Sequence, residues 1–472
     1  MTSLDHLLYK GDEHTAARST MMAILLLESA PDLARLRRSL ERASRVHHRL
    51  RERVVAPLIP LGPPRWLGDP DFDLDYHLRR VAAPAPATMT ELLAMASPIA
   101  MAPLDRRRPL WEATLVEGLE GGRAALLVKA HHALTDGIGG IEMLAAMLEL
   151  TPDPEPVMPV APAPHDVTPT ELAVHRLKSI PADAIRVAAG LVPLVRRTGT
   201  ALVNPSRTVA EASHAVSSVR RMFEGPGVPP SPLLRRRSLA RRIAVLERPL
   251  AELKAAGKLV DGTVNVAYLA ALGGALRAYH HAMGLPVDAV PAAIPVSFRA
   301  ADPSANNQWS GVQVALAVEP ADPLQRLRRV RTDMAASIEG AVDARLLGTL
   351  SSVMSMMPGV MLARMAEGAS SVDVQASNIP GIDATLYLAG SELAGIYGCG
   401  PLPGQAMMAV LVSYRGSCSI TVNYDTAAIQ DPQLFERCLV IGFDEICALG
   451  AASHPTAARP PRPGRRSPKG AR

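Results

Sequence analysis

Residues 125–140 read ALLVKAHHALTDGIGG and place a dense polar cluster at the end of an apolar run. The run from Ala125 predicts a buried strand that delivers His131 and His132 at its C-terminal end. IEMLAAMLEL, which starts at Ile141, predicts the helix that follows. Because successive side chains of a strand point to opposite faces, the two histidines are expected to have different roles.

Strands and helices alternate on both sides of this stretch. AILLLES at 23–29 has the length of a strand, and the segment from Asp32 carries Leu33, Leu36 and Leu40 at helical spacing on an otherwise basic, solvated helix. DFDLDY at 71–76 predicts a strand whose acids face outward. Such alternation favours an α/β fold with layered sheets and helices.

The alternation resumes after about residue 231. The sequence there predicts helices over ERPLAELKAAGKLV and from DGTVNVAYLA onward, strands at AAIPVSF, GVQVALAV, LYLAGSEL, MMAVLVSYRG and CSITVNYD, and a final helix at 432–449. Between the two halves, seven prolines lie among residues 151–169, a density that predicts an extended linker. The segment 171–203 then predicts an amphipathic helix, which either packs on a domain or lies on a lipid surface.

Four regions are therefore expected. They are an N-terminal subdomain at 1–150 with the two histidines, a proline-rich linker and helical connector at 151–230, a C-terminal subdomain at 231–453, and a disordered basic tail at 454–472.

The charge of the chain does not favour nucleic acid as a partner. The net charge is +5, but the tail contributes six basic residues and no acid, which leaves −1 for residues 1–453. Aromatic residues make up only 3% of the sequence, so few rings are available to stack on bases.

The cysteines and the N-terminal residues indicate the cellular compartment. Cys399, Cys418, Cys438 and Cys447 include no CxxC pair, which fits reduced thiols better than disulfides or a zinc site. The N-terminal residues MTSLDHLLYKGDEH lack the apolar core of a signal peptide, and no apolar run reaches the length of a membrane span. The expected location is the cytoplasm, with association to a membrane surface left open.

The histidine cluster suits acid–base chemistry. A neutral imidazole at a strand end can act as a general base near pH 7. Asp136 could orient the loop or a histidine tautomer, and Gly137 permits backbone conformations that a side chain forbids. A metal site is disfavoured because adjacent strand histidines diverge, while buried histidines without chemistry remain an alternative. The chain has no GxSxG elbow, Walker A loop or GxGxxG turn.

HHALTDG at 131–137 matches the HHxxxDG signature of acyltransferases that transfer acyl groups from thioesters. Four further stretches resemble segments of the bacterial wax ester synthase/diacylglycerol acyltransferase family in order and spacing: DFDLDYHLRR from Asp71, PLDRRRPLW from Pro103, PVSFR from Pro295 and SNIPG from Ser377. The chain thus resembles this family from about residue 3 to about residue 450.

The resemblance implies two chloramphenicol-acetyltransferase-like subdomains, each a mixed sheet flanked by helices, with an active-site tunnel at their interface. It implies that His132 is the catalytic base and that acyl-CoA is the co-substrate, with no metal or bound cofactor. Asp136 would be a structural partner of an arginine, for which Arg299 is the candidate. Ser377 and Asn378 are candidate substrate-binding groups or plain turn formers.

The same resemblance implies O-acylation of diacylglycerol, or of long-chain alcohols, by a protein peripherally associated with the inner membrane or lipid bodies. Three alternatives stay open. They are acylation of another hydroxyl, such as that of a polyketide or glycolipid, a non-catalytic homologue that binds acyl-CoA or lipid, and a carrier-dependent condensation domain.

One position departs from the family pattern. The family usually has Asn-Asp where this chain has Asn265 followed by Val266. If the missing acid tunes the active site, activity is reduced or redirected; if it caps a helix, its loss costs about 0.5–2 kcal/mol of stability. Asn265 is kept as a candidate substrate-binding residue.

Two side-chain clusters each have two interpretations. Five methionines between residues 354 and 365 could line an acyl-chain tunnel or pack in a core. The arginines at 235–237, 241 and 242 could attract CoA phosphates or an anionic membrane, or form a solvated patch.

Overall fold

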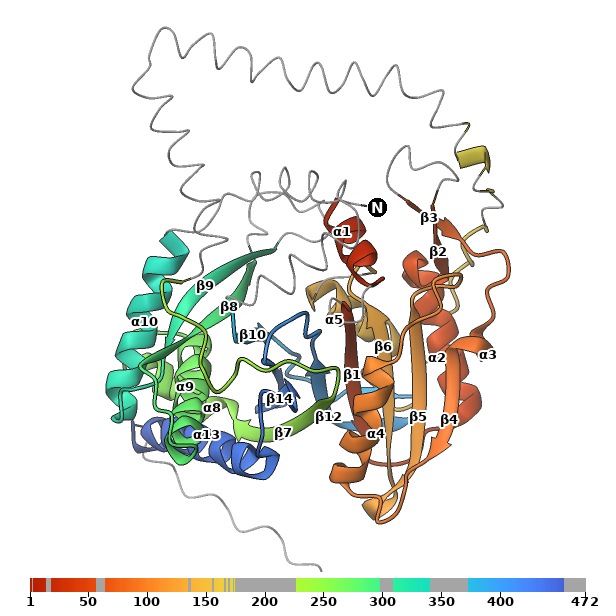
Figure 1. Ribbon diagram of the computed structural model, residues 1–472. Coiled ribbons are helices and arrows are strands. Elements are labelled where there is room, and N and C mark those ends of the chain that lie inside the picture. The colour runs from red at the N-terminus through yellow and green to blue at the C-terminus, as the bar shows by residue number, and fades with distance from the viewer. Residues whose placement is uncertain are drawn as a thin grey trace, which may run out of the picture.

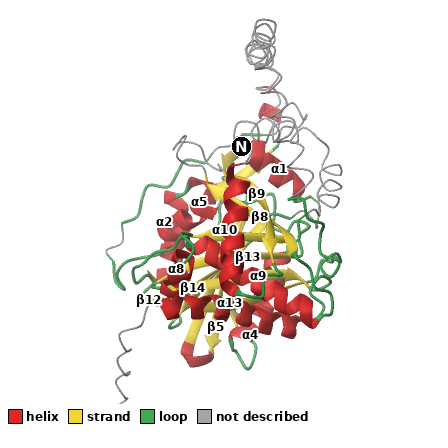
Figure 2. Ribbon diagram, turned by 90° about the vertical axis from the view of Figure 1, so that its left-hand side faces the viewer, coloured by secondary structure: helices red, strands yellow, loops and turns green. Residues whose placement is uncertain are grey.

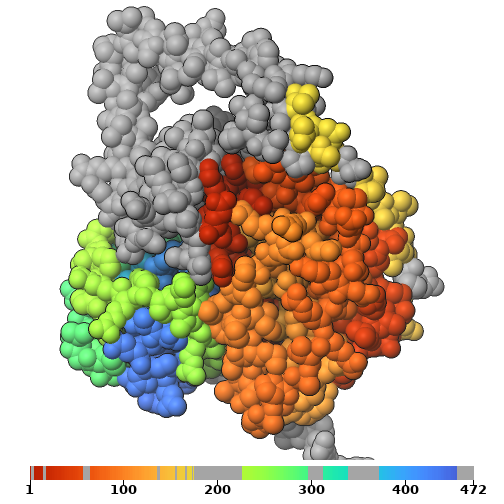
Figure 3. Space-filling view, turned by 45° about the vertical axis from the view of Figure 1, so that its right-hand side comes forward, coloured from red at the N-terminus to blue at the C-terminus, as the bar shows by residue number. Residues whose placement is uncertain are grey.

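The computed structural model shows an α/β protein with two six-stranded mixed sheets flanked by helices, which confirms the predicted fold class (Figure 1). The structure describes residues 1, 3–13, 18–56, 64–134, 137–154, 157–164, 167–168, 170–172, 174, 226–297, 309–339 and 372–453. In Figure 3 the described residues up to about 150, mostly orange, lie beside the described residues after 226, which are green to blue.

The first sheet has the strand order β11-β12-β1-β6-β5-β4. Its strands are β1 (Thr20–Leu27), β4 (Leu78–Ala82), β5 (Trp111–Leu119), β6 (Arg123–His131), β11 (Tyr387–Leu388) and β12 (Ser391–Cys399). All neighbours are antiparallel except β4 and β5. The central strand β1 reads TMMAILLL because apolar side chains must cover both of its faces.

Helices bury the two faces of this sheet. On one face, Leu36 and Leu40 of α2 (Leu33–Val46) and Met143 and Met147 of α5 (Gly137–Met147) pack with Leu25 and Leu27 of β1. On the other face, α4 (Met89–Met101) packs on Ile24 and Leu26. The remaining elements of this half are α1 (Ser3–Gly11), α3 (Leu74–His77), the short pair β2 (Glu52–Val55) and β3 (Arg65–Gly68), and the 3₁₀ turns η2 (His48–Arg51) and η3 (Glu120–Gly122).

The second sheet has the order β7-β14-β13-β10-β8-β9. Its strands are β7 (Arg241–Pro249), β8 (Ala289–Ser297), β9 (Trp309–Ala317), β10 (Val374–Ile379), β13 (Met407–Tyr414) and β14 (Ser417–Asp425). Helices α8 (Leu250–Lys258), α9 (Val264–Ala282), α10 (Pro323–Glu339) and α13 (Pro432–Ser453) cover it and face the viewer in Figure 2.

Helices α9 and α13 cross without intervening side chains. A Cβ atom added at Gly442 of α13 would lie 2.3 Å from the backbone nitrogen of Ala275 and 2.5 Å from the carbonyl oxygen of Ala271. Only glycine therefore allows the two helix backbones to approach this closely.

Sheet membership does not follow chain order. Strands β11 and β12 lie within the segment expected to form the C-terminal subdomain, yet β12 pairs antiparallel with β1 and completes the first sheet (Figure 1). The Tyr397 hydroxyl of β12 also donates a 2.6 Å hydrogen bond to Glu247 of β7. The boundary at residue 231 thus separates the halves along the chain but does not separate the two sheets.

Three secondary-structure expectations need correction. DFDLDY is not a strand, because Asp73 accepts a hydrogen bond from the backbone N–H of Asp75 at 2.9 Å and caps α3. Residues 247–249 end β7, and the helix expected there begins only at Leu250. LYLAGSEL is not one strand, because Ala389 and Gly390 have positive φ and form a turn between β11 and β12.

The proline-rich linker runs beside α2. Within the described residues 157–164 it forms neither helix nor strand. Arg45 donates to the carbonyl oxygen of Pro159 at 3.0 Å, and Arg35 pairs with Asp153 at 3.3 Å. These arginines of α2 are therefore not simply solvated, as the sequence suggested, but bind the linker. The helix predicted at 171–203 lies almost entirely outside the described residues, and the tail at 454–472 lies wholly outside them.

Two fully buried histidines make stability sensitive to acid. His77 stacks on Trp111 with ring centroids 4.5 Å apart, and His280 contacts Ser231 Oγ at 2.8 Å through its Nε2. Burial lowers the pKa of both imidazoles below the ordinary value of 6.5. The folded state then binds fewer protons than the unfolded chain, so stability is full above pH 6.5 and falls as the pH drops below it.

We expect the urea concentration at the unfolding midpoint to decrease as the pH is lowered from 7.5 to 5.5. Each buried histidine should lower the free energy of unfolding by up to about 1.4 kcal/mol per pH unit. The variant His280→Gln should be less stable at pH 7.5 but should lose less stability on acidification, because one titrating group is gone. The neighbouring His281→Gln, at an exposed position, is the control. An unchanged pH slope in His280→Gln would contradict this account.

Candidate active site

The two histidines at the end of β6 point in different directions, as predicted for successive residues of a strand. Val128, Ala130 and His132 line a pocket on one side. His131 is 1% exposed, and its Nε2 faces Asp12 on the other side. The backbone N–H of His132 donates to the carbonyl oxygen of Ser19 at 2.8 Å, which fixes the chain where it leaves the sheet.

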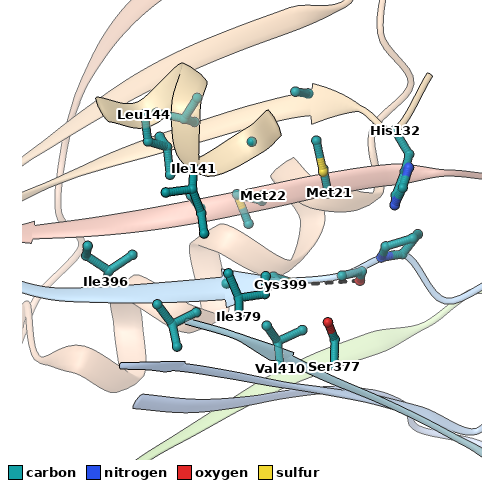
Figure 4. A pocket seen from close by; sticks show the side chains of 18 of the residues that line it. Met21, Met22, His132, Ile141, Leu144, Ser377, Ile379, Ile396, Cys399 and Val410 are labelled. Carbon is teal, nitrogen blue, oxygen red and sulfur yellow. Dashed lines mark hydrogen bonds between the residues drawn. The ribbon is translucent and has the colours of Figure 1, made fainter. Parts of the chain in front are cut away.

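The pocket is lined by residues from both halves of the chain. It lies between β1, β6 and α5 from the first half and β10, β12 and β13 from the second. His132 and Ser377 are at one end and their polar atoms point toward one another, whereas Ile141, Leu144 and Ile396 are at the other end (Figure 4). The arrangement is a polar pair at one end of an apolar pocket.

Strand β10 brings Ser377 to the pocket by its pairing with β13. Ser377 pairs with Val410 and Asn378 with Leu411 in a parallel register, so the two side chains leave opposite faces of the strand. Of the two candidates, only Ser377 lines the pocket.

The glycine that follows, Gly381, is required by close packing. Its N–H donates to Ser413 Oγ at 3.0 Å, and an added Cβ would overlap the carbonyl oxygen of Ser413 at 1.4 Å. The SNIPG stretch therefore anchors the end of β10 on β13.

Comparison with known families decides the assignment. Residues 1–268 match the wax ester synthase/diacylglycerol acyltransferase catalytic domain, and residues 305–447 match the WS/DGAT C-terminal domain. The chain belongs to the wax ester synthase/diacylglycerol acyltransferase family. The resemblance inferred from the motifs is thereby confirmed.

Relatives in this family cover nearly the whole chain. A Mycobacterium tuberculosis protein named as a diacylglycerol O-acyltransferase is 42% identical over 456 residues, which are 96% of this chain and 92% of that relative. A second protein of that name and organism is 33% identical over 391 residues, 79% of this chain and 80% of its own length.

Solved structures show the same fold. The wax ester synthase/diacylglycerol acyltransferase of Marinobacter aquaeolei VT8 aligns with a TM-score of 0.62 at 23% identity, covering 92% of this chain and 95% of that one. A point mutant of the starter condensation domain of rhizomide synthetase RzmA, in complex with C8-CoA, aligns with a TM-score of 0.56 at 13% identity, covering 96% and 94%.

The position that departs from the family pattern lies at a helix start, away from the pocket lining. Asn265 and Val266 are the second and third residues of α9, whose N-cap residue Thr263 makes no side-chain capping bond. An acid at the third position would complete a capping box with that threonine. Val266 instead packs in the core of the second half. This placement favours the helix-cap interpretation of the family aspartate.

We therefore expect Val266→Asp to leave kcat/KM unchanged within a factor of about three. The reason is that residue 266 does not line the pocket. Steady-state kinetics on the two proteins at equal folded concentration test this. A gain or loss of tenfold or more would show that this position acts on the chemistry.

Several predicted residues lie outside the described part of the chain. Asp136, Arg299 and the methionines at 354–365 are among them, so their predicted roles stay predictions. Gly137 is the first residue of α5. Among the residues that the structure describes, no three His, Cys, Asp or Glu side chains gather as metal ligands would.

The arginine cluster at 235–242 is partly structural. Arg237 pairs with the buried Asp373 at 3.3 Å, and Arg241 donates to the carbonyl oxygen of Leu402 at 2.8 Å. Arg235, Arg236 and Arg242 are exposed. For these three, both predictions stay open: attraction of CoA phosphates or an anionic membrane, or a solvated patch.

Sequence reasoning missed two sets of residues at the site. Met21, Met22, Met143 and Met408 line the pocket, although the methionines singled out in the sequence were others. Asp12, in the N-terminal segment that was considered only as a possible signal peptide, lies 3.6 Å from His131. The adjacent methionines at the start of β1 were a usable signal, but nothing in the sequence pairs Asp12 with a histidine more than a hundred residues away.

Proposed function

We propose that this protein transfers a fatty acyl group from acyl-CoA to the free hydroxyl of diacylglycerol, giving triacylglycerol, and also accepts long-chain alcohols, giving wax esters. The observation that carries the proposal is the apolar pocket with His132 and Ser377 at one end. Family membership and the names of the relatives support the acceptor class.

His132 acts as the general base. As the acceptor oxygen attacks the thioester carbonyl, the imidazole takes the hydroxyl proton, and a tetrahedral oxyanion forms. In this proposal the Ser377 hydroxyl, which faces His132 across the pocket, donates a hydrogen bond to that oxyanion. Collapse of the intermediate breaks the carbon–sulfur bond, and the imidazolium returns the proton to the CoA thiolate.

The acyl chain lies in the apolar part of the pocket. Ile141, Leu144 and Ile396 form its far end, and the methionine side chains adapt to a flexible chain. Cys399 also lines this pocket, but burial raises the pKa of its thiol to about 12. The thiol stays protonated at neutral pH and serves as an apolar wall rather than as a nucleophile.

Other residues have supporting roles in this proposal. Asp136 and Gly137 shape the turn after the histidines, with Arg299 as the partner of Asp136. Asn265 and Asn378 keep their predicted role in substrate binding in this proposal, although neither lines this pocket. No metal or bound cofactor takes part in the transfer.

Release of CoA from palmitoyl-CoA, with and without dipalmitin or hexadecanol, tests this function. Acceptor-dependent release would support it and would identify the acceptor. No release with either acceptor, but release with another hydroxyl compound, would favour a polyketide or glycolipid acceptor. Tight binding of acyl-CoA with no reactive acceptor would favour a non-catalytic binding protein.

We further propose peripheral association with the inner membrane or lipid bodies. Aliphatic side chains in the linker and just before it are strongly exposed: Leu150 is 71%, Val157 74% and Val160 91% exposed. None of the described helices is long and apolar enough to span a bilayer. Insertion of these side chains between lipid headgroups would bury apolar area near the lipid substrates.

Flotation with triolein emulsions coated with phosphatidylglycerol tests the association. We expect the wild-type protein in the floating fraction, and a Val157→Glu/Val160→Glu double variant mostly in the lower fractions. Complete absence of the wild-type protein from the floating fraction would contradict this part of the proposal.

A further inference from the structure

His131 is held in one tautomer by the turn that follows it. The backbone N–H of Ala133 donates to His131 Nδ1 at 2.9 Å. A ring nitrogen that accepts a hydrogen bond carries no hydrogen, so this geometry places the ring hydrogen on Nε2. That nitrogen lies 3.6 Å from the Oδ1 atom of Asp12, whose side chain is 7% exposed.

Asp12 also contacts the segment that holds His132. Its Oδ1 atom accepts a hydrogen bond from the backbone N–H of Ser19 at 2.9 Å. The carbonyl oxygen of the same Ser19 accepts the backbone N–H of His132 at 2.8 Å. The Asp12 carboxylate therefore lies within ion-pair distance of the His131 ring and is joined to the backbone of His132 by two hydrogen bonds through Ser19.

The position of Asp12 is set by the helix that precedes it. Its N–H donates to the carbonyl oxygen of Leu8 at 3.2 Å, which continues the last turn of α1 above the ends of β1 and β6 (Figure 1). The ring of Tyr9 contacts His131 edge-on, with centroids 6.1 Å apart. Arg106 lies over the Tyr9 ring at 3.7 Å and donates to the Tyr9 carbonyl oxygen at 2.6 Å.

The charge of Asp12 is retained at neutral pH. Burial alone would raise the pKa of this carboxyl, but His131, the hydrogen bond from the Ser19 N–H and the positive charge of Arg106 together lower it below its ordinary value. Among the described residues, the surrounding charged groups are Glu13 just after α1, Arg106 on the loop after α4, Arg18 before β1, and the Lys129–Glu112 pair on β6 and β5.

We propose that Asp12 is a positioning residue for acyl transfer, which acts through His131 and Ser19 to aim the imidazole of His132 and to stabilise the imidazolium formed during turnover. This inference rests on the proposed role of His132 as the base. A negative charge near a developing positive charge in a buried site lowers the free energy of the charged state.

The variant Asp12→Asn keeps the shape of the side chain and removes its charge. We expect kcat to fall by about 10- to 100-fold, because the base is both less stabilised and less well aimed. The acidic limb of the kcat/KM profile should move to lower pH, because the imidazolium loses a stabilising anion and gives up its proton more readily. Asp12→Glu, which keeps the charge, should recover part of the rate.

Glu13→Gln is the matched control, since it removes a neighbouring acid that pairs with Arg106 rather than with His131. We expect its rate and acidic limb to match those of the wild type. A purely structural role for Asp12 would lower the rate without moving the limb. An unmoved limb in Asp12→Asn, or an equal shift in Glu13→Gln, would overturn the inference.

A readout independent of turnover separates this inference from the proposed function. In ¹⁵N-histidine NMR spectra, the His132 ring should titrate at a lower pH in Asp12→Asn than in the wild type, by about half a pH unit, and His131 should keep its hydrogen on Nε2 in the wild type. If the two His132 titrations differ in this way but the wild-type protein releases no CoA with any acceptor, the proposed function alone is contradicted. Identical His132 titrations in both proteins would contradict the role of Asp12 alone.

Discussion

We expect His132→Ala to lower the kcat of acceptor-dependent CoA release by about a thousandfold. The side chain of His132 is a titratable group at the polar end of the pocket, opposite Ser377. Without it, the acceptor hydroxyl must lose its proton to water during the attack. Alanine leaves the backbone hydrogen bond from residue 132 to Ser19 in place, so the strand end should keep its conformation.

Binding and surface controls make this result specific. His132→Ala should bind palmitoyl-CoA with nearly wild-type affinity, because the apolar wall of the pocket is unchanged. His281→Ala, at an exposed position on α9, should retain wild-type kcat. A His132→Ala protein that folds and keeps more than a tenth of the wild-type rate would exclude His132 as the base.

The largest effect on stability is expected at the crossing of α9 and α13. We expect Gly442→Ala to destabilise the protein by about 3 kcal/mol, the upper end of the usual cost of overpacking. The added Cβ would lie 2.3 Å from a backbone nitrogen of α9. Backbone cannot rotate away as a side chain can, so the two helices must separate and expose part of the core. Chemical denaturation of both proteins measures the difference.

Val440→Ala on the same helix is the control for this substitution. Val440 is 42% exposed, and its truncation should change the free energy of unfolding by no more than about 0.5 kcal/mol. If Gly442→Ala were as stable as Val440→Ala, the close contact between the helix backbones would be wrong.

Local sequence patterns predicted most of the elements because apolar periodicity fixes strands and helices. The strand predicted at 23–29 overlaps β1, which spans Thr20–Leu27, and the apolar run from Ala125 is part of β6. The helical spacing of Leu36 and Leu40 is realised in α2. The wrong secondary-structure predictions have local causes that apolar periodicity does not capture. Asp73 caps a helix inside an alternating pattern that otherwise reads as a strand, and Pro249 marks the change from β7 to α8.

Prediction of the site depended on how far apart its residues lie in the chain. His132 and Ser377 were identifiable because each belongs to a short motif. The paired methionines of β1 were a signal in the sequence, but the rest of the apolar wall, such as Met408 and Ile396, could not be identified, because it exists only once β1, β12 and β13 are arranged beside one another. Asp12 was missed for the same reason, since its contact with His131 depends on how α1 lies over the sheet.

The pairing of β12 with β1 has a consequence for synthesis on the ribosome. Ser29, just after β1, is bonded to Ser391, 362 residues later in the chain. At typical bacterial elongation rates the first half therefore waits roughly half a minute for the strand that completes its sheet. During that time β1 presents an apolar edge with unpaired backbone groups, the kind of edge on which chains aggregate. Yield in the cell should thus depend on chaperones that cover this edge until residues 391–399 emerge from the ribosome.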